Sequence, residues 1–268
     1  MALILLLLAV ALWLALSFVL LRMFAAPMAG QSRRTRRVMA MAAAAGFLGA
    51  LVWGVALPGS LGIEAPALVM RLAGAAGLAA GVVLITVMRR PSPARVRFGL
   101  GIVATGLAPM LLLMNAHRDW GTPGGLPWVL GVVFTALSIG ATLEMVKSKD
   151  LRPAPSPGAL ERLLWAVLIV LSAVAAVVLM LGPLVAEPAA GWIGNRAASN
   201  VLGAIPLTLF MMGWMARNRA MLARPAGIGC AVLGLWGLAA VVLEGGPLWL
   251  GMVLGTLGLL GGLRALRP

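Results

Sequence analysis

The chain has 268 residues, of which 62% are hydrophobic and only 10% are charged. Soluble globular proteins have about 45 to 50% apolar and about 25% charged residues, so this composition excludes a water-soluble globule and predicts a membrane protein. The single histidine and the single cysteine exclude an internal disulfide, a metal site built from His and Cys, and a haem held by two histidines of this chain. We therefore expect no cofactor and no metal.

Nine apolar segments are long enough to cross a bilayer as helices, which takes about 20 residues. They lie at 2–22, 38–57, 67–88, 98–115, 127–146, 162–182, 198–216, 227–243 and 247–263. Such long runs favour helices over barrel strands, because lipid leaves the backbone no hydrogen-bond partner except its own helix. The predicted fold class is an all-α polytopic membrane protein with nine transmembrane helices.

The first segment has two interpretations, a retained anchor and a cleaved signal peptide. A signal carries positive charge before its apolar core. Here the basic run RRTRR at 33–37 follows the apolar segment, and only the terminal amine precedes it. We therefore interpret 2–22 as a retained anchor with the N-terminus outside.

The loops between the segments alternate in charge. Of the 21 basic residues, 18 fall in loops on one side of the membrane, and the other side has only Arg71, Arg118 and Arg196. Short loops rich in Lys and Arg stay in the cytoplasm, which predicts an outside N-terminus and a cytoplasmic C-terminus. We expect a multi-pass protein of a bacterial-type inner or plasma membrane. The net charge of +14 is then explained by the orientation of the chain in the membrane. We therefore expect membrane lipids as partners and do not expect nucleic acid.

Two parts of the chain resemble each other. Arg37 and Pro58 bracket the second segment at the same separation as Arg162 and Pro183 bracket the sixth. The sequence GLGIVATGL at 99–107 resembles GIGCAVLGL at 227–235, and GGLPWVLGVV at 124–133 resembles GGPLWLGMV at 245–253. One alternative is chance similarity between segments rich in Gly, Ala, Leu and Val; the other is a 1 + 4 + 4 parallel tandem repeat. The repeat divides the single membrane domain 1–268 into an anchor helix with its basic loop (1–36) and two four-helix repeats (37–150 and 151–268).

The predicted outer face carries polar residues beside two prolines. Pro109 lies six residues before Asn115, and Pro206 lies six residues after Asn200, so each proline is deeper in the membrane than its asparagine. A proline within a helix leaves one backbone carbonyl without its hydrogen bond. One interpretation is a substrate-binding site, because transporters bind substrates at such exposed backbone groups. The alternative is that these residues only cap and bend helices at the membrane interface. The candidate substrate-binding residues are Pro109, Asn115, His117, Arg118, Arg196, Asn200 and Pro206.

Two further sets of residues follow from the membrane setting. Arginines on the cytoplasmic side attract anionic lipid headgroups by about 1 kcal/mol per residue. This set contains Arg33, Arg34, Arg36, Arg37, Arg89 and Arg90. Glycines spaced four apart let helix backbones approach closely, within the bundle or against another subunit. This second set contains Gly77, Gly81, Gly251, Gly255, Gly258 and Gly262.

No Asp, Glu, Lys, Arg or His lies near the middle of a predicted span. Such charges mark proton relays and ion sites, so an ion-coupled antiporter is not expected, and carboxylates paired for catalysis are missing as well. The first hypothesis is a non-enzymatic facilitator or carrier of a small neutral, amphipathic or lipid-like molecule, with a cavity between the two four-helix halves. The alternative is an accessory, anchoring or assembly subunit that binds other membrane subunits or a second copy of itself. An enzyme acting on lipid at a membrane face is a third interpretation.

Overall fold

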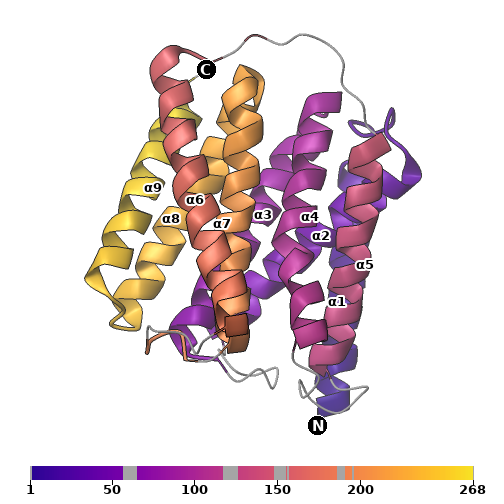
Figure 1. Ribbon diagram of the computed structural model, residues 1–268. Helices are drawn as coiled ribbons and strands as arrows, with labels where there is room; N and C mark the ends of the chain where they lie inside the picture. Colours follow the sequence, from indigo (N-terminus) through magenta and orange to yellow (C-terminus); the bar gives the residue numbers. More distant parts are fainter. Residues whose placement is uncertain are drawn as a thin grey trace.

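The computed structural model describes residues 2–56, 65–116, 126–147, 155, 157–185, 191–194 and 196–267. Within these residues the chain forms nine α-helices and one π-helical segment, with no strand (Figure 1). The elements are α1 (Ala2–Met23), α2 (Arg33–Gly49), η1 (Ala50–Ala56), α3 (Ala67–Arg89), α4 (Pro93–Ala116), α5 (Leu126–Lys147), α6 (Ala159–Val185), α7 (Arg196–Asn218), α8 (Ala220–Leu243) and α9 (Leu248–Leu266).

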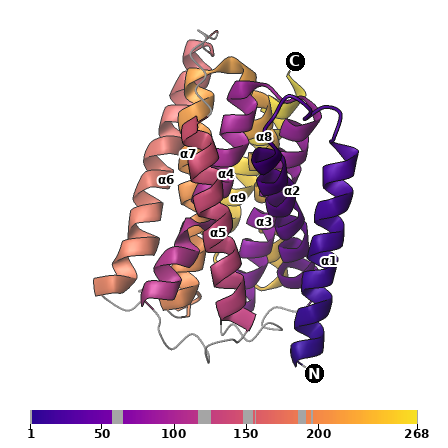
Figure 2. The same ribbon diagram turned by 90° about the vertical axis from the view of Figure 1, so that its right-hand side faces the viewer.

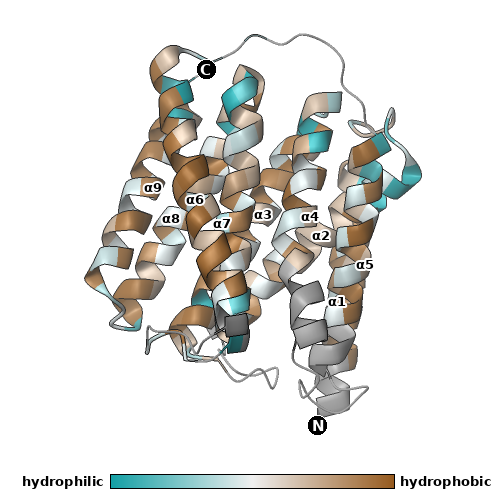
Figure 3. Cartoon of the chain, viewed as in Figure 1, coloured by the Kyte–Doolittle hydropathy of each residue, from teal (hydrophilic) through white to brown (hydrophobic). Residues whose placement is uncertain are grey.

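The helices have the length and composition of membrane spans. Within the described residues, α2 with part of η1, α3, α6, α7, α8 and α9 each contain a stretch apolar enough to cross a bilayer. Hydrophobic residues cover the sides of the bundle, and hydrophilic residues gather mainly at the end that carries the C-terminus (Figure 3). The chain is therefore a helical membrane protein, as its composition predicts.

Several helices begin before the apolar segments predicted from the sequence. α2 begins at Arg33 instead of residue 38, α4 at Pro93 instead of residue 98, and α8 at Ala220 instead of residue 227. A helix continues into polar residues where its end is stabilised, and Ser32 does this for α2 by accepting a 3.0 Å hydrogen bond from the Thr35 backbone N–H. The apolar run therefore indicates the part of a helix that lies in the hydrocarbon core, whereas the capping residue indicates where the helix begins.

The helices pack most extensively in sequential pairs, α2 and η1 with α3, α4 with α5, α6 with α7, and α8 with α9. The main contacts between pairs join α3 to α8 and α4 to α7. α1 packs against α2 and stands at one edge of the bundle, while α6 lies at another edge (Figure 2). Interhelical hydrogen bonds to carbonyl oxygens support three of these contacts: Trp13 Nε1 to Met41, Ser138 Oγ to Ala104, and Ser199 Oγ to Leu179, each 2.9 Å long.

Glycines make the closest contacts between helices. A Cβ added to Gly77 would lie 2.9 Å from the carbonyl oxygen of Gly46, and one added to Gly74 would lie 2.6 Å from the backbone nitrogen of Gly54. On the other side of the bundle Gly258 of α9 lies directly against the backbone of Gly234 in α8. Lipid provides no hydrophobic force between helices, so this close backbone packing is a main source of their association.

The other glycines of the predicted packing set differ in their surroundings. Gly81 faces the ring of Phe47 and the carbonyl of Ala43 on α2. A Cβ added to Gly251 or to Gly255 would be in ordinary van der Waals contact with Leu238. A Cβ added to Gly262 would have no neighbour within 4 Å among the described residues. The spacing of four residues therefore does not by itself identify the glycines that touch a neighbouring helix.

Neighbouring glycines on α9 test the packing account. A Cβ at Gly261 would lie 2.6 Å from the backbone nitrogen of Ala231, whereas one at Gly262 would meet open space. Gly261→Ala should reduce the free energy of unfolding by about 1 to 3 kcal/mol through overpacking. Gly262→Ala should leave it unchanged or raise it by up to about 1 kcal/mol, because alanine favours helix. Thermal unfolding of both variants in the same detergent measures the difference, and equal effects would contradict the account.

Candidate functional site

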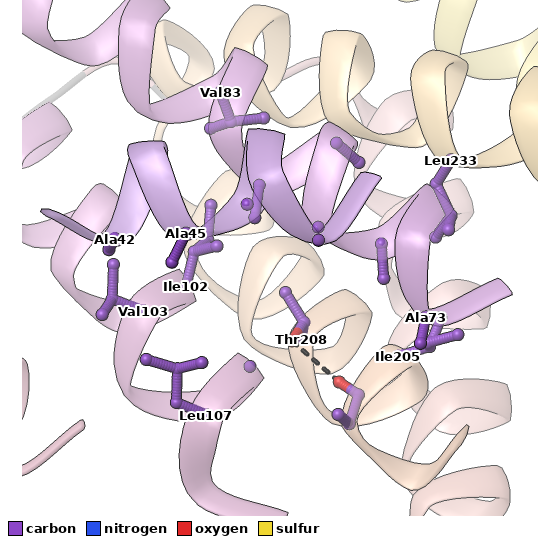
Figure 4. A pocket seen from close by; sticks show the side chains of 18 of the residues that line it. Ala42, Ala45, Ala73, Val83, Ile102, Val103, Leu107, Ile205, Thr208 and Leu233 are labelled. Atoms are coloured by element: carbon purple, nitrogen blue, oxygen red, sulfur yellow. Dashed lines mark hydrogen bonds between the residues drawn. The ribbon is translucent and has the colours of Figure 1, made fainter. Parts of the chain in front are cut away.

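A cavity of about 140 Å³ lies inside the bundle. Its wall is formed by α2, η1 and α3 together with α4 and α7, and by single residues of α5 and α8, namely Phe134 and Leu233. Figure 4 shows side chains of α2, α3, α4, α7 and α8 around this cavity. An engineered apolar cavity of about 150 Å³ stays dry and binds benzene-sized molecules, so this volume is sufficient for a small apolar ligand or part of a larger one.

The cavity is elongated along the helix axes. Its lining residues on α2 and η1 run from Ala42 to Trp53, and those on α7 run from Val201 to Met212. With a rise of 1.5 Å per residue, either stretch spans about 16 Å, roughly half of a bilayer's hydrocarbon core. A narrow space of this length suits an extended chain or a flat, elongated molecule.

Small side chains leave this space unfilled. Ala42, Ala45 and Gly49 line it from α2, and Ala73 and Ala76 line it from α3. The glycine contacts that bring α2 and α3 together therefore lie beside a wall made largely of alanine and glycine. The cavity follows from the same small residues that pack the helix pair.

The lining is uncharged and offers few hydrogen bonds. Thr208 is the hydroxyl-bearing residue among those that line the cavity, and its Oγ1 donates to the carbonyl of Ala204 at 2.8 Å (Figure 4). Trp53 also lines it, and its buried Nε1 finds no hydrogen-bond partner among the described residues. A buried donor without a partner is costly, so an acceptor atom on an otherwise apolar ligand would be favoured beside Trp53.

The π-helical segment places Trp53 in this wall. Arg71 of α3 donates from Nη1 to the carbonyl oxygen of Gly54 at 2.9 Å, and its Nε pairs with Glu244 at the end of α8. Wide π turns within helices occur frequently at functional sites. The sequence pattern does not predict this segment. The available signals were Gly49 and Gly54 within one span, and two opposite charges, Arg71 and Glu244, on the same predicted face.

The structure places the two proline-bearing helices of the predicted outer-face site side by side. A Cβ at Gly106 of α4 would lie 3.3 Å from Thr208 Oγ1 of α7, which fixes their register. α4 and α7 run in opposite directions, so residues after Gly106 are level with residues before Thr208. Pro109 lies three residues after Gly106, and Pro206 lies two residues before Thr208, so both prolines are at nearly the same depth. The side chain of Pro109 is outside the described residues, whereas Pro206 is buried within α7.

Asn200 is the candidate residue that the structure describes most fully. Its side chain is 1% exposed, its Oδ1 has no hydrogen-bond partner among the described residues, and the next residue, Val201, lines the cavity. Arg196 is exposed at the beginning of α7. The side chain of Asn115, at the end of α4, lies outside the described residues, as do all atoms of His117 and Arg118.

The predicted headgroup arginines lie at the end of the bundle that carries the C-terminus (Figures 1 and 3). Arg36 is partly buried, and the others are exposed, namely Arg33, Arg34, Arg37, Arg89 and Arg90. All are on α2, at the end of α3 or directly after it.

Two polar contacts at this end join the first and last helices of each predicted repeat. Glu144, in the last turn of α5, is 7% exposed. It accepts hydrogen bonds from Ser32 Oγ at 2.9 Å, directly before α2, and from Thr35 Oγ1 at 2.8 Å in the first turn of α2. Glu161 at the beginning of α6 pairs with Arg264 at the end of α9. The sequence alone suggests a local partner for Glu144, Lys147, which lies 3.8 Å away, but not the hydroxyl groups on α2.

No protein family, curated protein or solved structure matches the chain. Its function is therefore inferred from the cavity, the charges and the contacts of its own residues.

Two alanines of α2 test whether the cavity is open space. Ala45 lines it, whereas Ala43 is fully buried in packed surroundings. Ala43→Leu should lower the free energy of unfolding by about 1 to 3 kcal/mol through overpacking, and Ala45→Leu should change it by less, because the larger side chain enters the cavity. Chemical or thermal unfolding of both variants provides the comparison. A larger loss for Ala45→Leu would mean that the space is not available.

Proposed function

We propose that this protein is a facilitator or carrier of a small neutral, amphipathic or lipid-like molecule that binds in the cavity between α2, α3, α4 and α7. The observation that carries the proposal is the elongated, uncharged cavity within a membrane-spanning bundle. Binding sites for small molecules are mostly apolar with a few placed polar groups, and Trp53 and Thr208 provide such groups here.

The absence of charge on the described cavity wall bears on both substrate and coupling. An ion in this wall would lose its hydration without a compensating partner, so a neutral substrate is favoured. Proton or cation coupling through the membrane depends on ionisable side chains inside it. Facilitated movement down a concentration gradient therefore fits better than coupled transport.

The packing of the helices supports the proposed 1 + 4 + 4 repeat. If α2–α5 correspond to α6–α9, then exchanging the halves converts the contact of α3 with α8 into the contact of α7 with α4, and both contacts are present. The polar contact of Thr35 with Glu144 joins the first and fourth helices of one half, as Glu161 with Arg264 does in the other. Two related halves around a central site are a common transporter design.

Charge supports the proposed orientation, with the N-terminus outside and the C-terminus in the cytoplasm of a bacterial-type inner or plasma membrane. The arginine-rich helix ends lie together at the end of the bundle that carries the C-terminus (Figure 3). Arg71, which lies at the opposite end, is paired with Glu244 and adds little net charge there. This distribution follows the rule that basic short loops stay in the cytoplasm.

Cysteine labelling tests this orientation. A Cβ added to Gly30 or to Gly191 would have no neighbour within 4 Å among the described residues, and neither glycine has a positive φ. In a Cys230→Ala background, a membrane-impermeant maleimide added to intact cells should label Gly191→Cys and leave Gly30→Cys unlabelled until the membrane is permeabilised. The reverse pattern would contradict the orientation.

Flux through reconstituted protein tests the proposed activity. Proteoliposomes should accelerate transbilayer movement of a short-chain fluorescent phospholipid or of another member of a panel of neutral amphipathic solutes. Ala45→Leu should reduce this flux by about tenfold or more, because the larger side chain occupies space that the ligand needs. A loss of about 1.4 kcal/mol of binding free energy weakens binding tenfold. Gly262→Ala, in open space on α9, serves as the control and should retain full flux.

Trp53→Phe separates ligand binding from stability. It keeps an aromatic ring and removes an N–H that has no partner among the described residues, so the variant should be as stable as the parent or more stable, while its flux falls. Wild-type protein that moves no member of the panel, or Ala45→Leu with unchanged flux, would refute the transport proposal.

The accessory-subunit function is the second candidate, and the outer surface of α1 and α9 favours it. α1 packs mainly against α2 and exposes Leu8, Leu12 and Phe18, while Gly262 has open space beside it on α9. Purification in a mild detergent discriminates between the two. A stoichiometric partner subunit, or a stable homo-oligomer without flux, would favour the accessory role.

A further inference from the structure

Three arginines meet at the arginine-rich end of the bundle, where α3, α4 and α8 come together. Arg90 directly follows α3, and Arg95 in the first turn of α4 donates from Nη1 to the Arg90 carbonyl at 3.2 Å. Arg224 comes from α8. Its depth follows from the antiparallel packing of α3 and α8, in which a Cβ at Gly229 would lie 2.8 Å from Val83. Five residues further toward this end, Arg224 is level with Met88, two residues before Arg90, and its charge acts on Arg95.

These positive groups are not neutralised by the carboxylates that the structure describes. Those carboxylates have other partners: Glu144 bonds to Ser32 and Thr35, Glu161 to Arg264, and Glu244 to Arg71. The Nε of Arg95 is buried and has no hydrogen-bond partner among the described residues. A buried guanidinium N–H without an acceptor is costly, so an anion would be stabilised here.

Two further features make this place electropositive. Burial is the main cause that lowers the pKa of Arg95 below its ordinary value, and the positive charges of Arg90 and Arg224 lower it further because both arginines lie near Arg95. The N-terminus of α4 also begins here, with Ser92 Oγ accepting a hydrogen bond from the Arg95 backbone N–H at 3.3 Å. A helix N-terminus carries partial positive charge and favours anions.

We infer that Arg90, Arg95 and Arg224 form a binding site for a phosphate group. Guanidinium groups match phosphate oxygens through paired N–H donors. The three guanidinium groups come from the end of α3, the beginning of α4 and α8, so together they can surround one anion. The site lies before Phe98, where the predicted apolar segment of α4 begins, which is the depth of lipid headgroups. The phosphate can therefore belong to an anionic lipid or to a soluble ion. This site is separate from the central cavity and does not depend on the transport proposal.

Native mass spectrometry of the full chain in detergent tests the inference with dioleoyl phosphatidylglycerol as the probe. The wild-type protein should retain this lipid in preference to dioleoyl phosphatidylcholine. Arg224→Gln should weaken retention about fivefold, the effect of removing one basic residue near an anionic headgroup. Arg224 is exposed, so its replacement should leave folding intact, which thermal unfolding verifies.

The matched control is Arg217→Gln, which removes the same charge from an exposed position at the same end, on α7. It should change retention less than twofold. Arg95→Lys keeps the charge but loses the guanidinium donors, and it should also weaken retention. Competition with inorganic phosphate identifies the source: displacement of the lipid indicates a soluble phosphate site, and no displacement indicates a headgroup site. Equal losses for Arg224→Gln and Arg217→Gln, no loss for Arg224→Gln, or no binding of either probe would overturn the inference.

Discussion

Close backbone contact between glycines is the interaction on which this bundle depends. Helices in lipid gain nothing from hiding apolar side chains from water, so they associate where their backbones can touch. Gly46 with Gly77 and Gly54 with Gly74 hold α2 and η1 against α3, and Gly234 with Gly258 holds α8 against α9. The contacts between these pairs are looser, and they determine how much space remains inside the bundle.

The cavity is a consequence of this uneven packing. Alanine and glycine bring α2 and α3 together, and the same small residues face α4 and α7 without filling the space between them. The π turns of η1 place Trp53 in the wall, and Arg71 fixes these turns from the opposite helix by bonding to Gly54. Small residues therefore provide both the stability of the pair and the room for a ligand, while charge is confined to the ends of the bundle, as in Arg71 with Glu244 and Glu161 with Arg264.

The sequence predicts the helices well because apolar runs between charged loops have one stable form in lipid. It also predicts which helices carry the candidate asparagines and prolines, and α4 and α7 do lie together. It does not predict the cavity, because the space depends on small side chains of several helices that are distant in the chain. The hydroxyl partners of Glu144 and the approach of Arg224 to Arg95 are missed for the same reason: loop charges reveal the side of the membrane but not which helix ends are neighbours.

A density map of the protein in lipid nanodiscs, at a resolution that shows side chains, tests the central claim most directly. The account predicts a continuous elongated density along the wall from Ala42 to Trp53, with a polar atom within hydrogen-bond distance of Trp53 Nε1. It would be contradicted by a map in which α4 and α7 close against α2 and α3 and their side chains fill this space.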